Sequence, residues 1–193
     1  MDKIRVGIVG IGNIGTAHAN TLFGNEVDGA VLSAVCDILP ERRDFCKENY
    51  SGVKVFDNYG KMFESGLVDA VIVSTPHKLH CDIASDALRS GLNVLVEKPI
   101  DITVSKALDM NELARKSNKK FAIMFNQRTN DVFAKARQIV KSGSLGELKR
   151  TVWLITNWYR TQHYYDSAGW RATWSGEGGG VLLNQAPHNL DLW

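Results

Sequence analysis

The chain has 193 residues and a formal net charge of +2, with 44% hydrophobic and 23% charged residues. This composition is that of an ordinary globular protein, long enough for one large domain or for one and a half domains of common size. The nearly balanced charge, without a long block of lysine or arginine, argues against nucleic acid or an anionic membrane as a partner.

The three cysteines are Cys36, Cys46 and Cys81, an odd number without C-x-x-C spacing. Reduced thiols are therefore expected rather than a disulfide framework. No apolar signal core follows Met1 and no run of about 18 apolar residues occurs, so we expect a cytoplasmic protein that is neither exported nor inserted in a membrane. No cluster has the spacing of zinc or calcium ligands, so no metal is expected.

A glycine pattern near the N-terminus, Gly10-Ile11-Gly12-Asn13-Ile14-Gly15, follows an apolar run and precedes a predicted helix. Only glycine lets the backbone turn tightly, approach a pyrophosphate closely and pack the following helix against the strand. The helix N-terminus adds free N–H groups and a partial positive charge. The pattern predicts a dinucleotide cradle in which Gly10, Gly12, Asn13 and Ile14 bind the cofactor.

Short Val/Ile-rich runs alternate with helical stretches, the pattern of βαβ units on a parallel sheet. After the first strand, the predicted strands are residues 30–36, 53–56, 69–74, 92–96 and 120–125. The predicted helices between them are residues 40–50, 58–65, 77–90 and 103–117. The sequence thus predicts an α/β fold with a doubly wound, six-stranded parallel Rossmann sheet over residues 1–125.

The sequence of residues 126–193 lacks the alternation of strands and helices seen before it, so it predicts a second domain of another kind. A helix over residues 131–141 precedes a long strand, Glu147 to Tyr159, which is rich in aromatic and β-branched residues. A single long strand with no later strand to pair with would leave its backbone donors and acceptors open. We therefore expect an incomplete second domain and a native chain that continues past Trp193.

The second predicted strand ends at Asp37, at the position where a Rossmann domain places its ribose-binding carboxylate. Such a carboxylate accepts hydrogen bonds from the adenosine ribose and repels a 2′-phosphate, so NAD is favoured over NADP. Two alternatives stay open. Asp37 is otherwise a simple turn residue, and Arg42 or Arg43 nearby is able to bind a 2′-phosphate.

Four motifs together resemble the Gfo/Idh/MocA family of NAD(P)-dependent oxidoreductases. They are the glycine turn; Ser74-Thr75-Pro76 followed by His80; Glu97-Lys98-Pro99; and Gly178-Gly179-Gly180 leading through Asn184 to His188 and Asp191. The resemblance implies a second, α+β domain with an open, mostly antiparallel sheet. It also implies a homo-oligomer acting on sugars, inositols and related polyols.

The resemblance implies roles for further residues. It adds Ser74, Thr75, Pro76, His80 and Glu97 to the cofactor site, although Glu97 is alternatively a partner of Lys98. Lys98 resembles the residue that positions the substrate hydroxyl. The cleft of the family suggests that Arg128, Trp170 and Arg171 bind substrate.

His188 is the best candidate acid or base, because imidazole titrates near neutral pH. Asn184 lies four residues earlier and would share a face with His188 on a continuous helix, but Pro187 between them tends to break one. The family often has aspartate at the position of Asn184. Asparagine can hydrogen-bond but cannot supply the negative charge.

The expected function is hydride transfer between NAD and a secondary alcohol of a sugar, inositol or related polyol. Lys98, His188 and Asn184 are the expected catalytic residues. Two alternatives are an NAD-dependent glycosidase of the same family and a non-catalytic NAD-sensing regulator. The particular substrate and the direction of reaction are not predicted.

Overall fold

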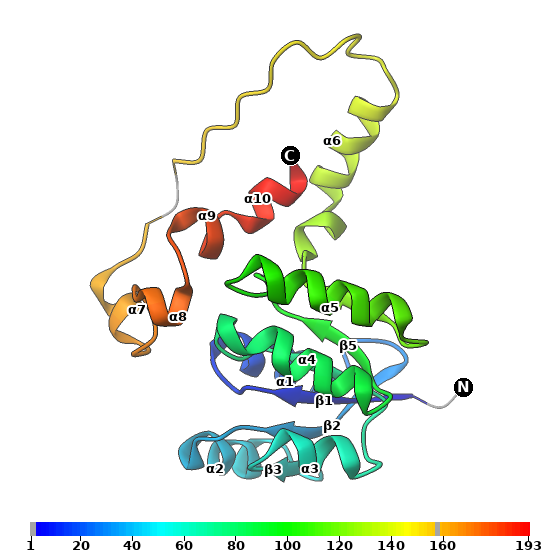
Figure 1. Cartoon of the computed structure of the whole chain (residues 1–193), viewed down its shortest axis with the longest axis vertical. Helices are drawn as coiled ribbons and strands as arrows, with labels where there is room; N and C mark the ends of the chain where they lie inside the picture. Colours follow the sequence, from blue (N-terminus) through cyan, green and yellow to red (C-terminus); the bar gives the residue numbers. More distant parts are fainter. Residues whose placement is uncertain (1–2, 157–158) are drawn as a thin grey trace. The chain divides into compact units, whose positions relative to one another are not determined.

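The computed structural model describes residues 3–156 and 159–193. The chain divides into two compact units, the first ending at Met124 and the second beginning at Phe125 (Figure 1). All strands of the described residues lie in the first unit, and the described part of the second unit is helical or irregular.

The first unit is built on one six-stranded sheet with the strand order β3-β2-β1-β4-β5-β6. Its strands are β1 Ile4–Val9, β2 Ala30–Cys36, β3 Lys54–Phe56, β4 Ala70–Val73, β5 Asn93–Val96 and β6 Phe121–Ile123. Every adjacent pair is parallel. The prediction of a doubly wound parallel sheet is confirmed, and the strand order reverses between β1 and β4, where such sheets bind ligands.

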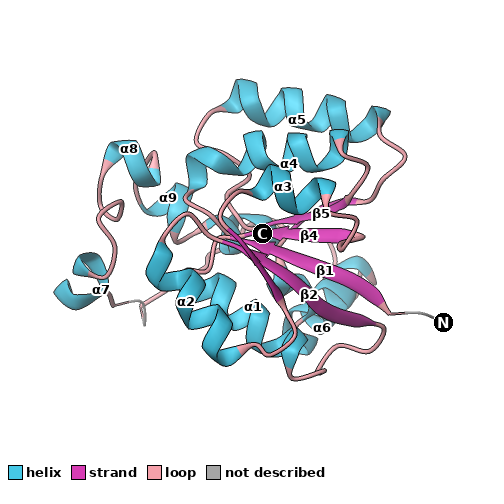
Figure 2. Ribbon diagram, turned by 90° about the horizontal axis from the view of Figure 1, so that it is seen from below, coloured by secondary structure: helices cyan, strands magenta, loops and turns pink. Residues whose placement is uncertain are grey.

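Helices cover both faces of this sheet (Figure 2). They are α1 Asn13–Phe23, α2 Pro40–Asn49, α3 Tyr59–Glu64, η1 His77–Leu79, α4 His80–Arg89 and α5 Val104–Lys116. In Figure 2, α1 and α2 lie on one face, and α3, α4 and α5 lie on the other. Pro40 opens α2, as predicted from its harmless lack of an N–H at the first turn.

Two hydrophobic clusters correspond to the two faces, and β4 contributes to both. Val71 and Val73 belong to the cluster with α3, α4 and α5, whereas Ile72 between them belongs to the cluster with α1 and α2. This alternation follows from the two-residue period of a strand. All three side chains are buried, and burial of one such side chain stabilises the fold by roughly 1.5–3 kcal/mol.

The second unit contains short helices. They are η2 Asn126–Thr129, α6 Asp131–Lys141, α7 Gln162–Asp166, α8 Trp174–Glu177, α9 Val181–Asn184 and α10 Pro187–Leu192. The predicted helix over residues 131–141 matches α6, whose N-terminus is capped by the Asn130 side chain accepting from the Val132 N–H. Threonines cap α7 and α8 in the same way.

The predicted strand Glu147 to Tyr159 is wrong in the residues that the structure describes. Residues 147–156 and Tyr159 form no strand, and residues 157–158 of the prediction lie outside the described residues. Leu154 and Tyr159 are each 81% exposed. The β-branched and aromatic composition favours an extended backbone, but a strand needs a second strand to hydrogen-bond. The described part of this unit contains none.

Two further expectations concern the cysteines and membranes. Cys36, Cys46 and Cys81 are free, as predicted, and the structure shows that all three are buried. No helix among the described residues combines the length and the apolar character needed to cross a bilayer.

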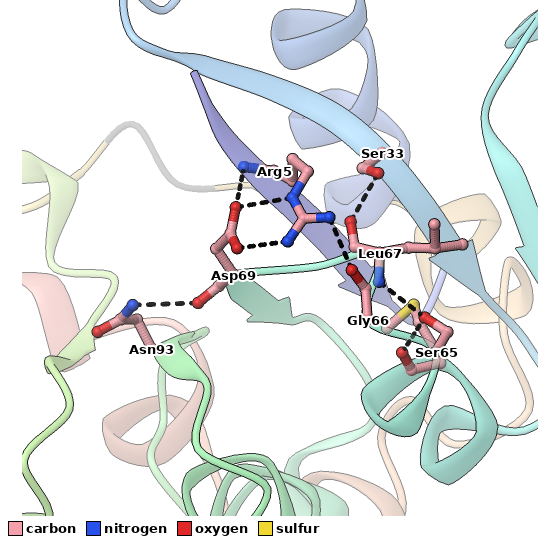
Figure 3. A network of polar contacts seen from close by, with 8 residues as sticks. Arg5, Ser33, Ser65, Gly66, Leu67, Asp69 and Asn93 are labelled. Carbon is pink, nitrogen blue, oxygen red and sulfur yellow. Dashed lines mark hydrogen bonds and ion pairs between the residues drawn. The ribbon is translucent and has the colours of Figure 1, made fainter. Parts of the chain in front are cut away.

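The loop before β4 is hydrogen-bonded to residues of β1, β2 and β5 (Figure 3). Asp69 accepts hydrogen bonds from the Arg5 backbone N–H at 2.9 Å and from the Arg5 guanidinium at 2.7 and 3.0 Å. Ser33 of β2 donates to the Leu67 carbonyl, and Asn93 of β5 donates to the Asp69 carbonyl. These bonds fix where β4 enters the sheet.

Asp69→Asn tests this anchor through its pH dependence. The hydrogen bonds from Arg5 lower the pKa of Asp69 from 3.8 to about 2. Because the folded state favours the carboxylate, its contribution to stability is present above pH 3.8 and is lost as the pH falls toward 2. We expect Asp69→Asn to lower the free energy of unfolding modestly at neutral pH, since solvent screens this exposed pair.

Chemical denaturation of the wild type and of Asp69→Asn across this pH range measures the difference between their free energies of unfolding. This difference should vanish near pH 2. Asp28→Asn, at an exposed loop position, is the matched control. A stability difference that is independent of pH would contradict the assignment.

Candidate functional site

The carboxyl ends of β1 and β4 meet at Gly10 and Ser74. Gly10 has a φ of +92°, and a Cβ atom there would lie 2.8 Å from the Ser74 carbonyl oxygen. The Ser74 hydroxyl donates to the Gly10 carbonyl at 2.8 Å. Ser74, a predicted cofactor ligand, thus contacts the glycine turn directly and holds it against β4.

The other two glycines of the turn differ in their surroundings. A Cβ atom at Gly15 would lie 1.9 Å from the Gly10 carbonyl oxygen, so α1 packs against the turn only without a side chain there. A Cβ atom at Gly12 would meet nothing within 4 Å. The turn is closed on the protein side at Gly15 and open at Gly12, which is the arrangement needed for close approach of a pyrophosphate.

Asp37 follows β2 and binds the backbone of this turn. Its Oδ2 accepts from the Ile11 N–H at 2.7 Å and its Oδ1 accepts from the Leu39 N–H at 2.9 Å. Each carboxylate oxygen retains a second lone pair, so acceptor capacity for ribose hydroxyls remains. The Arg43 guanidinium donates to the carbonyls of Asp37 and Ile38, so its contacts lie with the backbone behind the carboxylate.

Three observations fit these residues to a dinucleotide. The N-cap of α1 is Gly12, without a side-chain cap and without an acidic residue in the first turn, so the N-terminal N–H groups of the helix face no competing side-chain anion from the helix itself. Asn13 and Ile14 at this end are exposed. Thr75, after β4, has a buried hydroxyl oxygen with no hydrogen-bond partner, which a ligand hydroxyl or amide would satisfy.

Glu97 directly follows β5 and is 7% exposed. Its Oε1 lies 2.8 Å from His18 Nε2, and its Oε2 accepts the Lys98 backbone N–H at 3.2 Å. The structure therefore pairs the Glu97 carboxylate with His18, which the sequence analysis missed. The two residues are 79 positions apart in the sequence, so no local spacing indicated this pair.

His80 connects two segments at the same edge. Its Nε2 lies 2.7 Å from the Thr75 carbonyl oxygen and its Nδ1 lies 2.7 Å from the Pro99 carbonyl oxygen. Burial lowers the pKa of His80, while the two carbonyls and the carboxylates of Glu97 and Asp101 oppose that shift. His80 thus links the segments after β4 and β5, and Lys98 stands between Glu97 and the cis peptide to Pro99.

In the second unit, the structure separates Asn184 from His188 by a helix break. Helix α9 ends at Asn184, and Pro187 opens α10 at its first turn. The helix break that Pro187 favours is therefore observed, because proline lacks the N–H that a helix interior needs, and the continuous helix required for a shared face does not form. Asn184 is buried and donates to Glu177 Oε1 at 2.5 Å. Glu177, which is 8% exposed, was not among the predicted site residues. Position 184 has no carboxylate of its own, but the buried carboxylate of Glu177 contacts it.

His188 lies in α10 among aromatic and charged groups. Its ring is edge-on to Phe125, with centroids 6.0 Å apart. Arg128, a predicted substrate residue, makes a bidentate ion pair with Asp191. This pair, and secondarily His188, lower the pKa of Asp191 against the effect of burial.

The other predicted substrate residues form an aromatic and cationic cluster around Tyr164. The Arg171 guanidinium lies 4.1 Å from the Tyr164 ring centroid and 4.9 Å from that of Trp170. Arg171 also donates to the Tyr164 hydroxyl, which accepts from Gln185 as well. The planar guanidinium is suited to this stacking.

Alanine at Gly12 and at Gly15 tests the asymmetry of the turn. Gly15→Ala forces a methyl group against a backbone carbonyl that cannot rotate away, so we expect a loss of about 1–3 kcal/mol or more in the free energy of unfolding. Gly12→Ala is expected to keep or slightly raise stability, by ~0.4–1 kcal/mol at most, because its φ of −79° suits alanine.

Denaturant titration measures stability and NADH titration measures binding in the same two variants. Gly12→Ala should weaken NADH binding by about tenfold or more, equal to ~1.4 kcal/mol, since its methyl group occupies the open position. Equal stabilities for the two variants would contradict the close packing at Gly15. Unaltered NADH binding by Gly12→Ala would contradict the approach of the cofactor at Gly12.

Comparison with known proteins places both parts of the chain in one family. Residues 4–125 match the family described as "Oxidoreductase family, NAD-binding Rossmann fold", and residues 133–193 match its C-terminal domain. The chain is 27% identical to the rhizopine catabolism protein MocA of Rhizobium meliloti, over 99% of this chain and 56% of that protein. It is 32% identical to an inositol 2-dehydrogenase of Corynebacterium glutamicum, over 76% of this chain and 43% of that protein.

The similar solved structures include some with bound ligands. Scyllo-inositol dehydrogenase from Lactobacillus casei, with bound NAD(H) and scyllo-inositol, matches with a TM-score of 0.72 at 30% identity, over 76% of this chain and 43% of that one. The WlbA dehydrogenase from Bordetella pertussis, in complex with NADH and UDP-GlcNAcA, matches with a TM-score of 0.85 at 28% identity, over 98% and 58%. The chain spans about half the length of the curated relatives it matches. With matches over both units and the predicted motifs in place, the chain belongs to the Gfo/Idh/MocA oxidoreductase family.

Proposed function

We propose that this protein is an NAD-dependent dehydrogenase that transfers hydride between NAD and a secondary alcohol of a sugar, inositol or related polyol. The observation that carries the proposal is the open position at Gly12 within a turn that is otherwise closed by backbone contacts. Ligand-bound relatives, one with scyllo-inositol and another with UDP-GlcNAcA, support the substrate class.

In this proposal the glycine turn and α1 bind the pyrophosphate, Asp37 binds the adenosine ribose, and the Thr75 hydroxyl donates to or accepts from the dinucleotide. We propose that the other predicted cofactor residues shape the cofactor site at the strand ends. They are Ser74, Pro76, His80 and Glu97. The nicotinamide supplies hydride acceptance and return when bound.

The chemistry on the protein side rests on three residues. Lys98 donates a hydrogen bond to the reacting oxygen and favours its alkoxide through positive charge. His188 takes or returns the hydroxyl proton. Asn184, held by Glu177, contributes a hydrogen bond to that oxygen or to the imidazole. Arg128, Trp170 and Arg171 contribute to substrate binding.

We also propose a domain organisation, an oligomeric state and a location for the protein. Residues 1–125 form the dinucleotide-binding domain, and residues 126–193 contribute to an α+β substrate-binding and oligomerisation domain with an open, mostly antiparallel sheet. The protein is then a cytoplasmic homo-oligomer without nucleic-acid or membrane partners. The two family models, which match residues 4–125 and 133–193, support the division into two domains.

Asp37→Ser tests the choice of cofactor. The wild-type protein should bind NADH in preference to NADPH, because the carboxylate bonds ribose hydroxyls and repels a 2′-phosphate. The substitution should reduce that preference by about tenfold to hundredfold, since hydrogen bonds to a charged group contribute ~1.5–3 kcal/mol. Fluorescence titration with both cofactors measures the ratio, and Asp44→Ser on exposed α2 is the control. Wild-type preference for NADPH would contradict the role of Asp37.

Lys98→Met tests the chemical step. We expect turnover with a panel of inositols, sugars and nucleotide sugars to fall by roughly 10²–10³-fold, the range for loss of one donor that stabilises a developing oxyanion, while NADH affinity stays close to that of the wild type. Absorbance of reduced nicotinamide measures turnover, and Lys116→Met, exposed on α5, is the control.

Other outcomes separate the alternatives. Glycoside cleavage without net NADH would indicate the glycosidase reaction instead. NAD binding with no turnover on any substrate of the panel would favour a regulatory protein and contradict the dehydrogenase proposal.

A further inference from the structure

Glu97 is a nearly buried carboxylate whose two oxygens both face hydrogen-bond donors of the chain. Its side chain is 9% exposed, and that of its partner His18 is 19% exposed. A carboxylate removed from water needs such partners, since an unpaired buried charge is costly. One oxygen meets an imidazole of α1 at 2.8 Å and the other meets the backbone N–H of Lys98 at 3.2 Å.

The imidazole of His18 reaches Glu97 from the helix that starts at the glycine turn. The contact spans 79 residues of sequence, so it joins elements that local folding does not bring together. Since a carboxylate only accepts hydrogen bonds, Nε2 of His18 carries the proton in this pair. The pair therefore ties the first turns of α1 to the end of β5.

The residue on the other side of Lys98 is also held by an imidazole. The Pro99 carbonyl lies 2.7 Å from His80 Nδ1. The backbone of Lys98 is thus flanked by Glu97, which His18 contacts, and by Pro99, which His80 contacts. Of the two, only the His18 contact originates from the helix of the proposed cofactor cradle.

We propose that His18 is a positioning residue: by orienting the Glu97 carboxylate, it fixes the backbone of Lys98 relative to the helix that binds the cofactor. This inference rests on the proposed function, because the cradle and the lysine acquire their roles from it. Its consequence is that the α1 end of the cradle and the Lys98 segment are energetically coupled, and that the coupling passes through one imidazole–carboxylate pair.

The first test is a double-mutant cycle of His18→Leu and Glu97→Gln, measured as NADH affinity of the whole 193-residue chain. His18→Leu removes the donor with little change in volume, and Glu97→Gln removes the negative charge. Each single change should weaken NADH binding by about fivefold to tenfold. The double variant should be no weaker than the worse single variant, because both remove the same interaction.

Rescue distinguishes positioning from filling of space. Glutamine at position 18 has an amide N–H that is able to donate to the Glu97 carboxylate, so His18→Gln should return NADH affinity to within about threefold of the wild type. Glu48→Gln, exposed on α2, is the matched control for loss of one carboxylate. Thermal unfolding of each variant confirms that affinities are compared between folded proteins.

Hydrogen exchange of the Lys98 amide gives a readout that does not need the cofactor. Its protection should fall at least tenfold in His18→Leu, while the Val73 amide, in the centre of the sheet, stays protected. Unaltered Lys98 exchange, fully multiplicative effects in the cycle, or no rescue by glutamine would each overturn the inference. If the wild-type chain fails to bind NADH, the proposed function falls and with it the coupling to the cofactor, whereas unaltered exchange with intact NADH binding rejects the role of His18 alone.

Discussion

The site depends on two backbone segments that meet without room for a side chain. At the end of β1 the chain turns at Gly10, in a conformation that favours glycine, and α1 returns so closely that a Cβ atom at Gly15 would overlap the Gly10 carbonyl oxygen. The neighbouring end of β4 closes the same contact through Ser74. Because this packing places the α1 N-terminus at the reversal of strand order, the fold itself forms an anion-binding position.

Three carboxylates, two at the carboxyl ends of the strands and one in the second unit, accept hydrogen bonds from donors of the chain. Asp37 accepts from the backbone of the glycine turn, Glu97 from His18 and Lys98, and Glu177 from Asn184. Each is oriented by donors of the chain before any ligand arrives, which reduces the cost of ordering it on binding. Pre-oriented acceptors and donors are what hydride transfer to a particular carbon requires from the protein, since the cofactor supplies the chemistry.

Local patterns predicted the first unit well and the second unit less well. The strand Ala30–Cys36 and the helix Asp131–Lys141 agree with the sequence prediction, because their periodicity and caps are encoded in adjacent residues. His18 was missed because its partner is 79 residues away, beyond any local pattern. The strand predicted from Glu147 was wrong in its described residues because pairing, unlike propensity, depends on a second segment. Pro187 is a local signal that correctly indicated a helix break between Asn184 and His188.

In the proposed function, the open glycine turn and the adjoining strand ends form the NAD site. Backbone amide chemical shifts of the whole chain, followed during titration with NAD, test it residue by residue. We expect saturable shifts at Gly12, Asn13 and Ile14, with further shifts at Asp37 and Thr75, while Leu67 and Asn93, at the opposite ends of the strands, stay unchanged. Saturable shifts confined to those opposite ends, or none at the glycine turn at saturating NAD, would contradict the proposed site.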